Sequence, residues 1–171
     1  MNATDEVLLR NWQPTDAPEL SKHLNNMNIL KDLPHTLPSP YTTAHARVFI
    51  GMSNCHDSGL ERAIEYRGEL AGGISLIPQE DIWTHCAEIR FYTAEHLWNR
   101  KIMQRALALS IREAFDDFNF VRLHAWVFET NEKAIHVLQK NGFSQEGVLR
   151  KAAFREKEFH NVCLLSLLNQ E

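Results

Sequence analysis

The stretch of sequence that decides the fold is residues 131–150, NEKAIHVLQKNGFSQEGVLR. Its apolar residues recur at helical spacing and would share one face of a helix: Ala134, Ile135 and Leu138. Asn131 can cap that helix, because its side-chain oxygen accepts backbone N–H groups. Gly142 can end it, because glycine adopts the left-handed conformation without a Cβ clash. We therefore predict a helix from Asn131 that turns at Gly142 toward a strand near residues 147–154.

The composition indicates a globular protein. The chain has 171 residues, of which 44% are hydrophobic and 23% charged, enough for one domain (residues 1–171) with a sizeable core. The net charge of −4 argues against a broad nucleic-acid surface. The cysteines are odd in number and lack a CxxC pair, so we expect no disulfide framework or zinc site and favour a reducing, cytoplasmic setting. We see no signal peptide and no membrane-spanning run.

Short strands and helices alternate along the chain. The predicted strands are residues 7–10, 62–66, 70–77, 84–93, 121–128, 147–154 and 162–168. The predicted helices run from Thr15 or Asp16 to about Asn26, from Thr42 or Thr43 through Ile50, from about Asn99 to Phe115, and from Asn131. The proline-rich residues 33–40 read as a loop. The strand–helix–strand order of the second half implies parallel pairing and the hairpins imply antiparallel pairing, so the sheet should be mixed.

Two distant segments resemble one known family. Residues 131–150 resemble the N-xx-(A/S)-x-x-V-L-x-K-x-GF-xx-EG-x-L-R segment of the GNAT N-acetyltransferases, in their RimJ/RimL-like branch. Residues 8–20, LLRNWQPTDAPEL, resemble the start of the same members. The resemblance implies an α+β fold with α/β/α layers, a mixed central sheet of about six to seven strands flanked by helices. It also implies an N-acetyltransferase that moves an acetyl group from acetyl-coenzyme A (acetyl-CoA) directly to a primary amine.

The resemblance points to residues 86–104 as the part that holds the co-substrate. In the family, the loop after a central strand and the start of the next helix hold the pyrophosphate of acetyl-CoA, as the helix dipole favours. By this resemblance the cofactor-binding residues are Phe91, Tyr92, Thr93, Trp98, Asn99, Arg100, Lys101, Ile102, Met103, Gln104 and Asn131.

The loop departs from the family pattern. Relatives carry W-G-x-G-x-(A/G), and here Trp98 matches whereas Asn99 and Lys101 replace the two glycines and Met103 the small residue. Glycine adopts positive φ at no cost, asparagine tolerates it, and lysine does so poorly. Two interpretations stay open. Either Arg100, Lys101 and Arg105 supply charge in place of close backbone contacts, or the site has decayed.

Glu88 and Asn131 are the candidate catalytic residues. Direct transfer requires removal of a proton from the amine and stabilisation of the oxyanion and the thiolate. By resemblance, a backbone N–H near Phe91 or Tyr92 polarises the acetyl carbonyl, and Glu88 matches a glutamate that acts as general base through water. Alternatively, Glu88 pairs with Arg90, which points to the same face of the strand. Asn131 matches an asparagine beside the pantetheine arm, and it can also be only a helix cap.

The residues of the usual general acid are missing. Ala134 and Leu138 stand where relatives carry a serine or a tyrosine, which leaves Tyr92 or a water. His85 and His124 lie on strands expected to be neighbours and can form a polar pair, although simple packing is favoured and no metal site is predicted.

The resemblance leaves the acceptor open between a protein N-terminus, a polyamine and another small amine. No nucleic-acid or membrane partner is expected, and a homodimer is compatible with the resemblance. The second hypothesis is a degenerate GNAT domain that binds a ligand or partner without catalysis.

Overall fold

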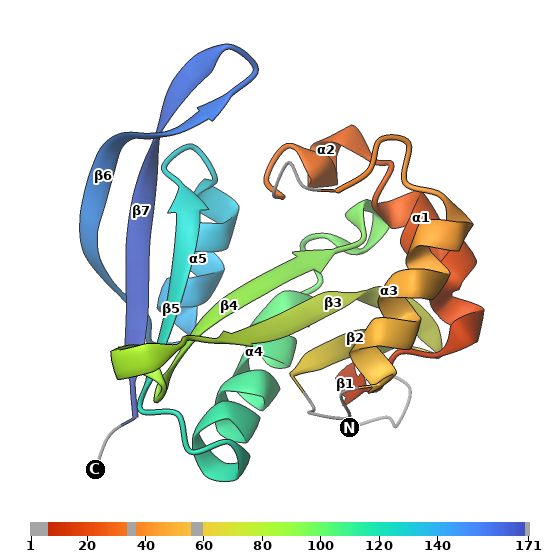
Figure 1. Cartoon of the computed structure of the whole chain (residues 1–171), viewed down its shortest axis with the longest axis horizontal. Coiled ribbons are helices and arrows are strands. Elements are labelled where there is room, and N and C mark those ends of the chain that lie inside the picture. Colours follow the sequence, from red (N-terminus) through yellow and green to blue (C-terminus); the bar gives the residue numbers. More distant parts are fainter. Residues whose placement is uncertain (1–6, 34–36, 56–59, 170–171) are drawn as a thin grey trace. The chain divides into compact units, whose positions relative to one another are not determined.

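The computed structural model describes residues 7–33, 37–55 and 60–169. Within these residues, seven strands form one sheet in the order β1-β2-β3-β4-β5-β7-β6 (Figure 1). The strands are β1 (Val7–Arg10), β2 (Glu61–Tyr66), β3 (Glu69–Pro78), β4 (Cys86–Thr93), β5 (Arg122–Phe128), β6 (Ser144–Arg155) and β7 (Glu158–Leu168). The helices are α1 (Ala17–His23), α2 (Met27–Leu30), α3 (Thr43–Cys55), α4 (Ile102–Arg112) and α5 (Glu132–Lys140).

The sheet is mixed, as predicted. β4 runs parallel to β5, while the β1–β2, β2–β3, β5–β7 and β6–β7 pairs are antiparallel. The parallel pair is joined through α4, which is the crossover that parallel strands require. The predicted fold class, a mixed central sheet flanked by helices, is therefore confirmed. No helix in the described part of the chain is long and apolar enough to cross a membrane.

The chain divides into two compact units. Unit 1 comprises residues 1–75 and 91–106, and unit 2 comprises residues 76–90 and 107–171. β3, β4 and α4 contribute residues to both units. The assignment of the whole chain to one domain stays a prediction.

In unit 1, α1 and α3 pack against each other and cover strands of the sheet (Figure 1). Their core is made by Trp12, Ala17, Leu20, Leu24, Tyr41, Ala46, Ile50, Ala63 and Leu70. The β2–β3 hairpin turns at Arg67 and Gly68, whose φ angles of 53° and 80° are those of a tight two-residue hairpin turn. The hydroxyl of Thr42 accepts the N–H of His45 at 3.2 Å, so Thr42 rather than Thr43 caps α3.

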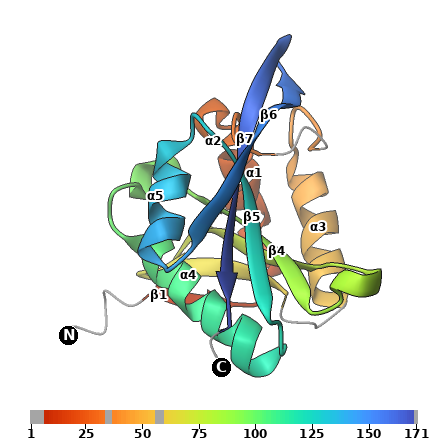
Figure 2. The same ribbon diagram turned by 90° about the vertical axis from the view of Figure 1, so that its left-hand side faces the viewer.

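In unit 2, the stretch quoted first folds as predicted. The side chain of Asn131 accepts the N–H of Ala134 at 3.2 Å and caps α5. Gly142 has φ of 90° and ends the helix, and Leu138 and Phe143 are buried. β6 then pairs with β7 in a long hairpin, which Figure 2 shows from the side. Local sequence signals determine this segment because cap, apolar face and glycine stop all agree.

Several predicted boundaries were wrong. The first helix ends at His23 instead of about Asn26, because the side chain of Asn26 caps the separate helix α2. α4 begins at Ile102 instead of Asn99, because the residues before it have left-handed backbone, and it continues as a π-helical turn to Asp117. β4 starts at Cys86 instead of residue 84, because Asp81–Trp83 forms a 3₁₀ helix that ends in a turn. Residues 34–36 of the predicted loop lie outside the described residues.

Candidate functional site

The end of β4 in unit 1 is held from two sides. The N–H of Ala94 donates to the carbonyl of Ala71 at 2.8 Å. A Cβ added at Gly72 would lie 2.1 Å from the carbonyl oxygen of Tyr92, so only glycine allows this approach. The indole N–H of Trp98 donates to the carbonyl of Thr93 at 2.9 Å and ties the following loop back to the strand. Phe91, Tyr92 and Thr93 therefore lead into a loop with a fixed base.

The loop keeps a left-handed backbone at both positions where relatives carry glycine. Asn99 has φ of 64° and Lys101 has φ of 59°. A residue with a Cβ pays about 1–2 kcal/mol for this conformation, and lysine has no local hydrogen bond to offset it. Such strain persists only where the surrounding structure holds it, and it occurs often at functional sites.

α4 starts directly after the loop. The N–H of Arg105 donates to the carbonyl of Lys101 at 3.2 Å, which closes the first helical turn. The N–H groups of the first residues, Ile102 to Gln104, have no intrahelical acceptor and form the positive end of the helix dipole. Ile102 is buried and anchors the turn, Met103 and Gln104 are half-buried, and the side chains of Arg100 and Lys101 are exposed beside it. This arrangement suits a phosphate group.

Tyr92 is not available as the missing acid. Its ring packs against the core of unit 1, and its hydroxyl is buried without a hydrogen-bond partner among the described residues. Burial raises the pKa of this phenol, and Tyr41 and Asp16 raise it further. The phenol therefore contributes to packing between the helices and the sheet.

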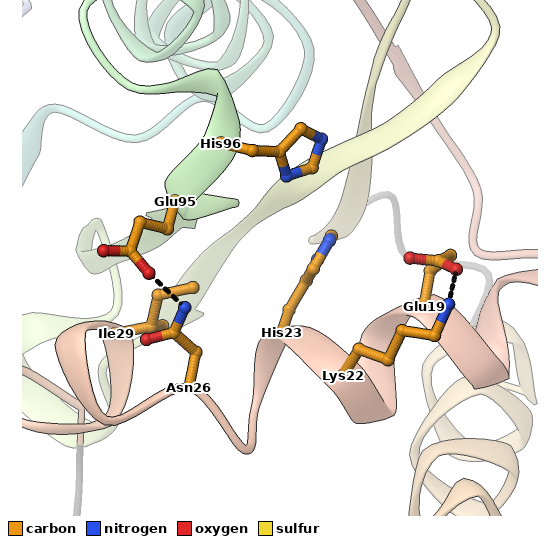
Figure 3. Close-up of a pocket in the computed structure, with 7 residues that line it drawn as sticks. All are labelled: Glu19, Lys22, His23, Asn26, Ile29, Glu95 and His96. Atoms are coloured by element: carbon orange, nitrogen blue, oxygen red, sulfur yellow. Dashed lines mark hydrogen bonds and ion pairs between the residues drawn. The ribbon is translucent and has the colours of Figure 1, made fainter.

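An open pocket of about 460 Å³ lies in unit 1 between α1, the start of α2 and the segment that follows β4 (Figure 3). Its lining is Glu19, Lys22, His23, Asn26, Ile29, Glu95 and His96. The two carboxylates are already partnered, since Lys22 pairs with Glu19 and the amide of Asn26 donates to Glu95. Burial lowers the pKa of His23, which favours the uncharged imidazole. The pocket is therefore lined by polar side chains, and both of its carboxylates already have hydrogen-bond partners.

In unit 2, Glu88 is bound by Arg90. The guanidinium donates to both carboxylate oxygens, with Nε–Oε1 at 2.6 Å and Nη2–Oε2 at 3.0 Å. The Glu88 side chain is 14% exposed and that of Arg90 is 47% exposed. The structure thus contains the ion pair that the strand parity suggested, whereas the role of Glu88 as a base stays a prediction.

His124 on β5 stands directly opposite Glu88 in the parallel β4–β5 ladder. Paired residues of adjacent strands share one face of a sheet. The opposite face is closed, because Ala87, Ile89 and Leu123 are buried. The register partner of His124 is Glu88 and not His85, whose backbone carbonyl accepts the N–H of Val121. The sequence could not reveal the Glu88–His124 register, because the crossover through α4 leaves the offset between the two strands undetermined.

The environment of His124 favours its neutral form. Burial lowers the pKa of the imidazole, and Arg122 lowers it further, against the opposing effects of Glu88 and Glu146. Glu146 is itself bound by both terminal nitrogens of Arg122 and by the hydroxyl of Ser166. These hydrogen bonds lower the pKa of Glu146 to about 2.

The β4–β5 ladder is short. Its register covers only Cys86–Glu88 against Arg122–His124, whereas β5 continues to Phe128 with its ladder to β7 intact. Among the described residues, no register pairs the later part of β5 with β4, and an unpaired strand edge of this kind can pair with an extended chain. Asn131 follows at once, its N–H donating to the carbonyl of Phe128 at 2.8 Å. No group in the described part of the chain has the composition of a metal site.

Comparison with known proteins gives a consistent result. The acetyltransferase (GNAT) domain family matches residues 6–144. Spermidine N(1)-acetyltransferase of Escherichia coli strain K12 is 24% identical over 177 residues, which cover 100% of this chain and 90% of the relative.

Two solved structures illustrate the shared fold. Ribosomal-protein-S5-alanine acetyltransferase from Vibrio fischeri is 19% identical, covers 96% of this chain and 94% of its own, and superposes with a TM-score of 0.83. Mycobacterium smegmatis RimJ, solved in complex with CoA-disulfide, is 21% identical, covers 95% and 81%, and superposes with a TM-score of 0.82.

Proposed function

The chain belongs to the acetyltransferase (GNAT) family, and from this premise we propose that it acetylates the primary amine of a small molecule or of a protein N-terminus. Membership confirms the predicted family, the enzyme class and acetyl-CoA as co-substrate. The acceptor and the residues that act on it are the proposal.

One observation carries the proposal for this chain's own residues: the positive φ angles of Asn99 and Lys101, directly before α4. They support a loop that still presents its backbone to a phosphate, although both glycines are absent. The amides of residues 99–104 would hold the pyrophosphate, with Arg100 and Lys101 adding charge. Trp98 would hold the loop in place, and the backbone of Phe91–Thr93 would face the acetyl end of the co-substrate. Asn131, at the end of the β5 edge, would contact the pantetheine arm.

For the chemistry, we propose that Glu88 supports removal of the proton from the amine. It is a carboxylate of low exposure beside the end of the β4–β5 ladder. Within unit 1, the pocket beside His23 is a candidate site for a polar group of the acceptor, since burial lowers the pKa of His23 and favours its uncharged form. The relatives act on spermidine or on a ribosomal protein, so both kinds of amine are candidates. The free cysteines support a cytoplasmic setting, and a homodimer remains part of the proposal.

A titration of the purified chain with acetyl-CoA, followed by a thiol-release assay, tests this function. We expect calorimetric binding below about 1 mM, the upper end of ordinary KM values, and turnover with spermidine or with a peptide that has a free N-terminus. Replacing Arg100 and Lys101 together by alanine should weaken acetyl-CoA binding at least about tenfold. Lys140→Ala, which removes an exposed cation at the end of α5, is the matched control and should leave binding unchanged.

The result also separates the two classes of function. No heat and no thermal shift at about 1 mM acetyl-CoA would overturn the proposed enzyme. Binding without turnover of any amine in the panel would instead favour the non-catalytic, ligand-binding module.

A further inference from the structure

The carboxylate of Glu88 is already paired with the guanidinium of Arg90. Both of its oxygens accept hydrogen bonds from Arg90, one at each oxygen. An incoming ammonium would compete with a bidentate guanidinium, which is the strongest partner a carboxylate finds among side chains. A second group is therefore needed to take the proton from the amine directly.

His124 is placed to be that group. It lies opposite Glu88 across the parallel ladder, on the face away from the buried Leu123 and Ala125. It is half-buried, so part of the residue is reachable from solvent. The register between β4 and β5 also ends at this residue pair, so His124 borders the backbone edge of β5.

The charges that face His124 come from three strands. Glu88 on β4 and Glu146 on β6 favour the imidazolium, while Arg122 on β5 itself disfavours it. Ser166, its partner on β7, adds a hydroxyl without charge. Burial outweighs the carboxylates and lowers the pKa of His124, so the imidazole is neutral near pH 7 and can accept a proton.

We propose that His124 accepts the proton of the acceptor ammonium and that Glu88, held by Arg90, acts through His124 by stabilising the imidazolium. This inference rests on the proposed function. The ammonium gives one proton to the imidazole, which passes it to solvent. The neutral amine then attacks the thioester carbonyl, the C–N bond forms and the C–S bond breaks. The second proton leaves the nitrogen for the CoA thiolate, so the products are the N-acetyl amine, CoA thiol and one H⁺.

Trp126 extends the same site. It lies two residues beyond His124 on β5, on the same face, and its ring meets the His124 ring edge-on at 6.0 Å. Trp126 is 46% exposed. An exposed indole face attracts a cation, so an ammonium bound there would be next to the imidazole. Trp126→Leu should raise KM for a cationic amine about threefold and leave the pH profile unchanged.

The test compares His124→Gln, His124→Ala, Glu88→Gln and wild-type protein, with three readouts: acetyl-CoA affinity, kcat/KM against pH, and rescue of His124→Ala by free imidazole. His124→Gln should lose at least about 100-fold in kcat/KM, keep its acetyl-CoA affinity, and lose the acidic limb of the profile. Imidazole added to His124→Ala should restore part of the rate. Glu88→Gln should lose less, about tenfold, and its acidic limb should move to lower pH because the carboxylate no longer raises the pKa of His124.

The possible results point to different conclusions. If wild-type protein fails to bind acetyl-CoA, the proposed function is overturned and this role with it. If acetyl-CoA binds but His124→Gln keeps kcat/KM within threefold of wild type while Glu88→Gln loses 100-fold, Glu88 is the direct base and this role alone is overturned. Circular dichroism and the thermal midpoint of each variant show that it is folded, and rescue that increases with the neutral fraction of the added imidazole distinguishes a proton acceptor from a filled cavity.

Discussion

The loop at residues 98–102 in unit 1 and the Glu88 position in unit 2 depart from expectation in opposite ways. The loop lacks both expected glycines, yet Asn99 and Lys101 hold the left-handed backbone that glycines would adopt. Position 88 has the expected glutamate, yet Arg90 occupies its carboxylate. The loop therefore keeps the glycine-like backbone conformation without the glycines. Position 88 keeps the expected glutamate, but its carboxylate is already bound by another side chain.

The difference lies in what holds each position. The loop is fixed by its neighbours, through the Trp98–Thr93 bond before it and the first turn of α4 after it. These contacts can impose a strained φ on a lysine at a cost of about 1–2 kcal/mol. The side chain of Glu88 is not fixed by backbone contacts of this kind. The group that binds it depends on which residues lie two positions along the strand and opposite it on the neighbouring strand. In this protein, the backbone conformation of the loop is therefore a better indicator of the co-substrate site than the identity of its side chains.

The largest expected effect comes from a substitution at the end of β4, which precedes the loop at residues 98–102. Gly72→Ala places a Cβ 2.1 Å from the carbonyl oxygen of Tyr92, a backbone atom that cannot move away cheaply. We expect the free energy of unfolding in urea to fall by about 3 kcal/mol and acetyl-CoA binding to fall with it. Gly51→Ala is the control, because its Cβ meets nothing within 4 Å and α3 gains a better helix former. Unchanged stability in Gly72→Ala would mean that the end of β4 does not fix the loop.

The next effect separates the backbone of the loop from its charge. Lys101→Gly should raise the free energy of unfolding by about 1 kcal/mol, because glycine adopts φ near 59° without a clash. If the backbone amides hold the pyrophosphate, acetyl-CoA affinity should change less than threefold in calorimetry. A tenfold loss in affinity with the same gain in stability would instead identify the ammonium of Lys101 as the main phosphate ligand.

Sequence signals predicted the fold well wherever they were local. The helix from Asn131, its stop at Gly142 and the mixed sheet follow from capping, periodicity and element order. The pairing of His124 with Glu88 was out of reach, because a parallel register is set by the intervening crossover and not by either strand. The positive φ of Lys101 was also out of reach, since lysine on its own argues against that conformation.

A smaller effect concerns Asn131, for which two roles were left open. Asn131→Ala should lower the free energy of unfolding by about 1 kcal/mol, because α5 loses its cap at the N–H of Ala134. Asn131→Ser keeps a capping oxygen and should restore most of that stability. If Asn131→Ser is stable but binds acetyl-CoA more weakly, the amide also contacts the pantetheine arm; if both variants bind normally, Asn131 is a cap alone.

The smallest expected effect concerns Arg90. The experiment tests whether its guanidinium weakens the electrostatic effect of the Glu88 carboxylate on the imidazole of His124. Arg90→Gln removes the cation bound to both carboxylate oxygens, which leaves the negative charge of Glu88 less compensated opposite His124. A stronger negative field favours the imidazolium, so the pKa of His124 should rise. Its titration can be followed by the imidazole resonances in NMR, and the acidic limb of kcat/KM should move to higher pH by the same amount. Because Glu88→Gln is expected to move that limb to lower pH, opposite shifts in the two variants would place Glu88 and His124 in one electrostatic unit. A shift in Arg90→Gln without one in Glu88→Gln would mean that Arg90 acts on the imidazole directly and that the carboxylate contributes little.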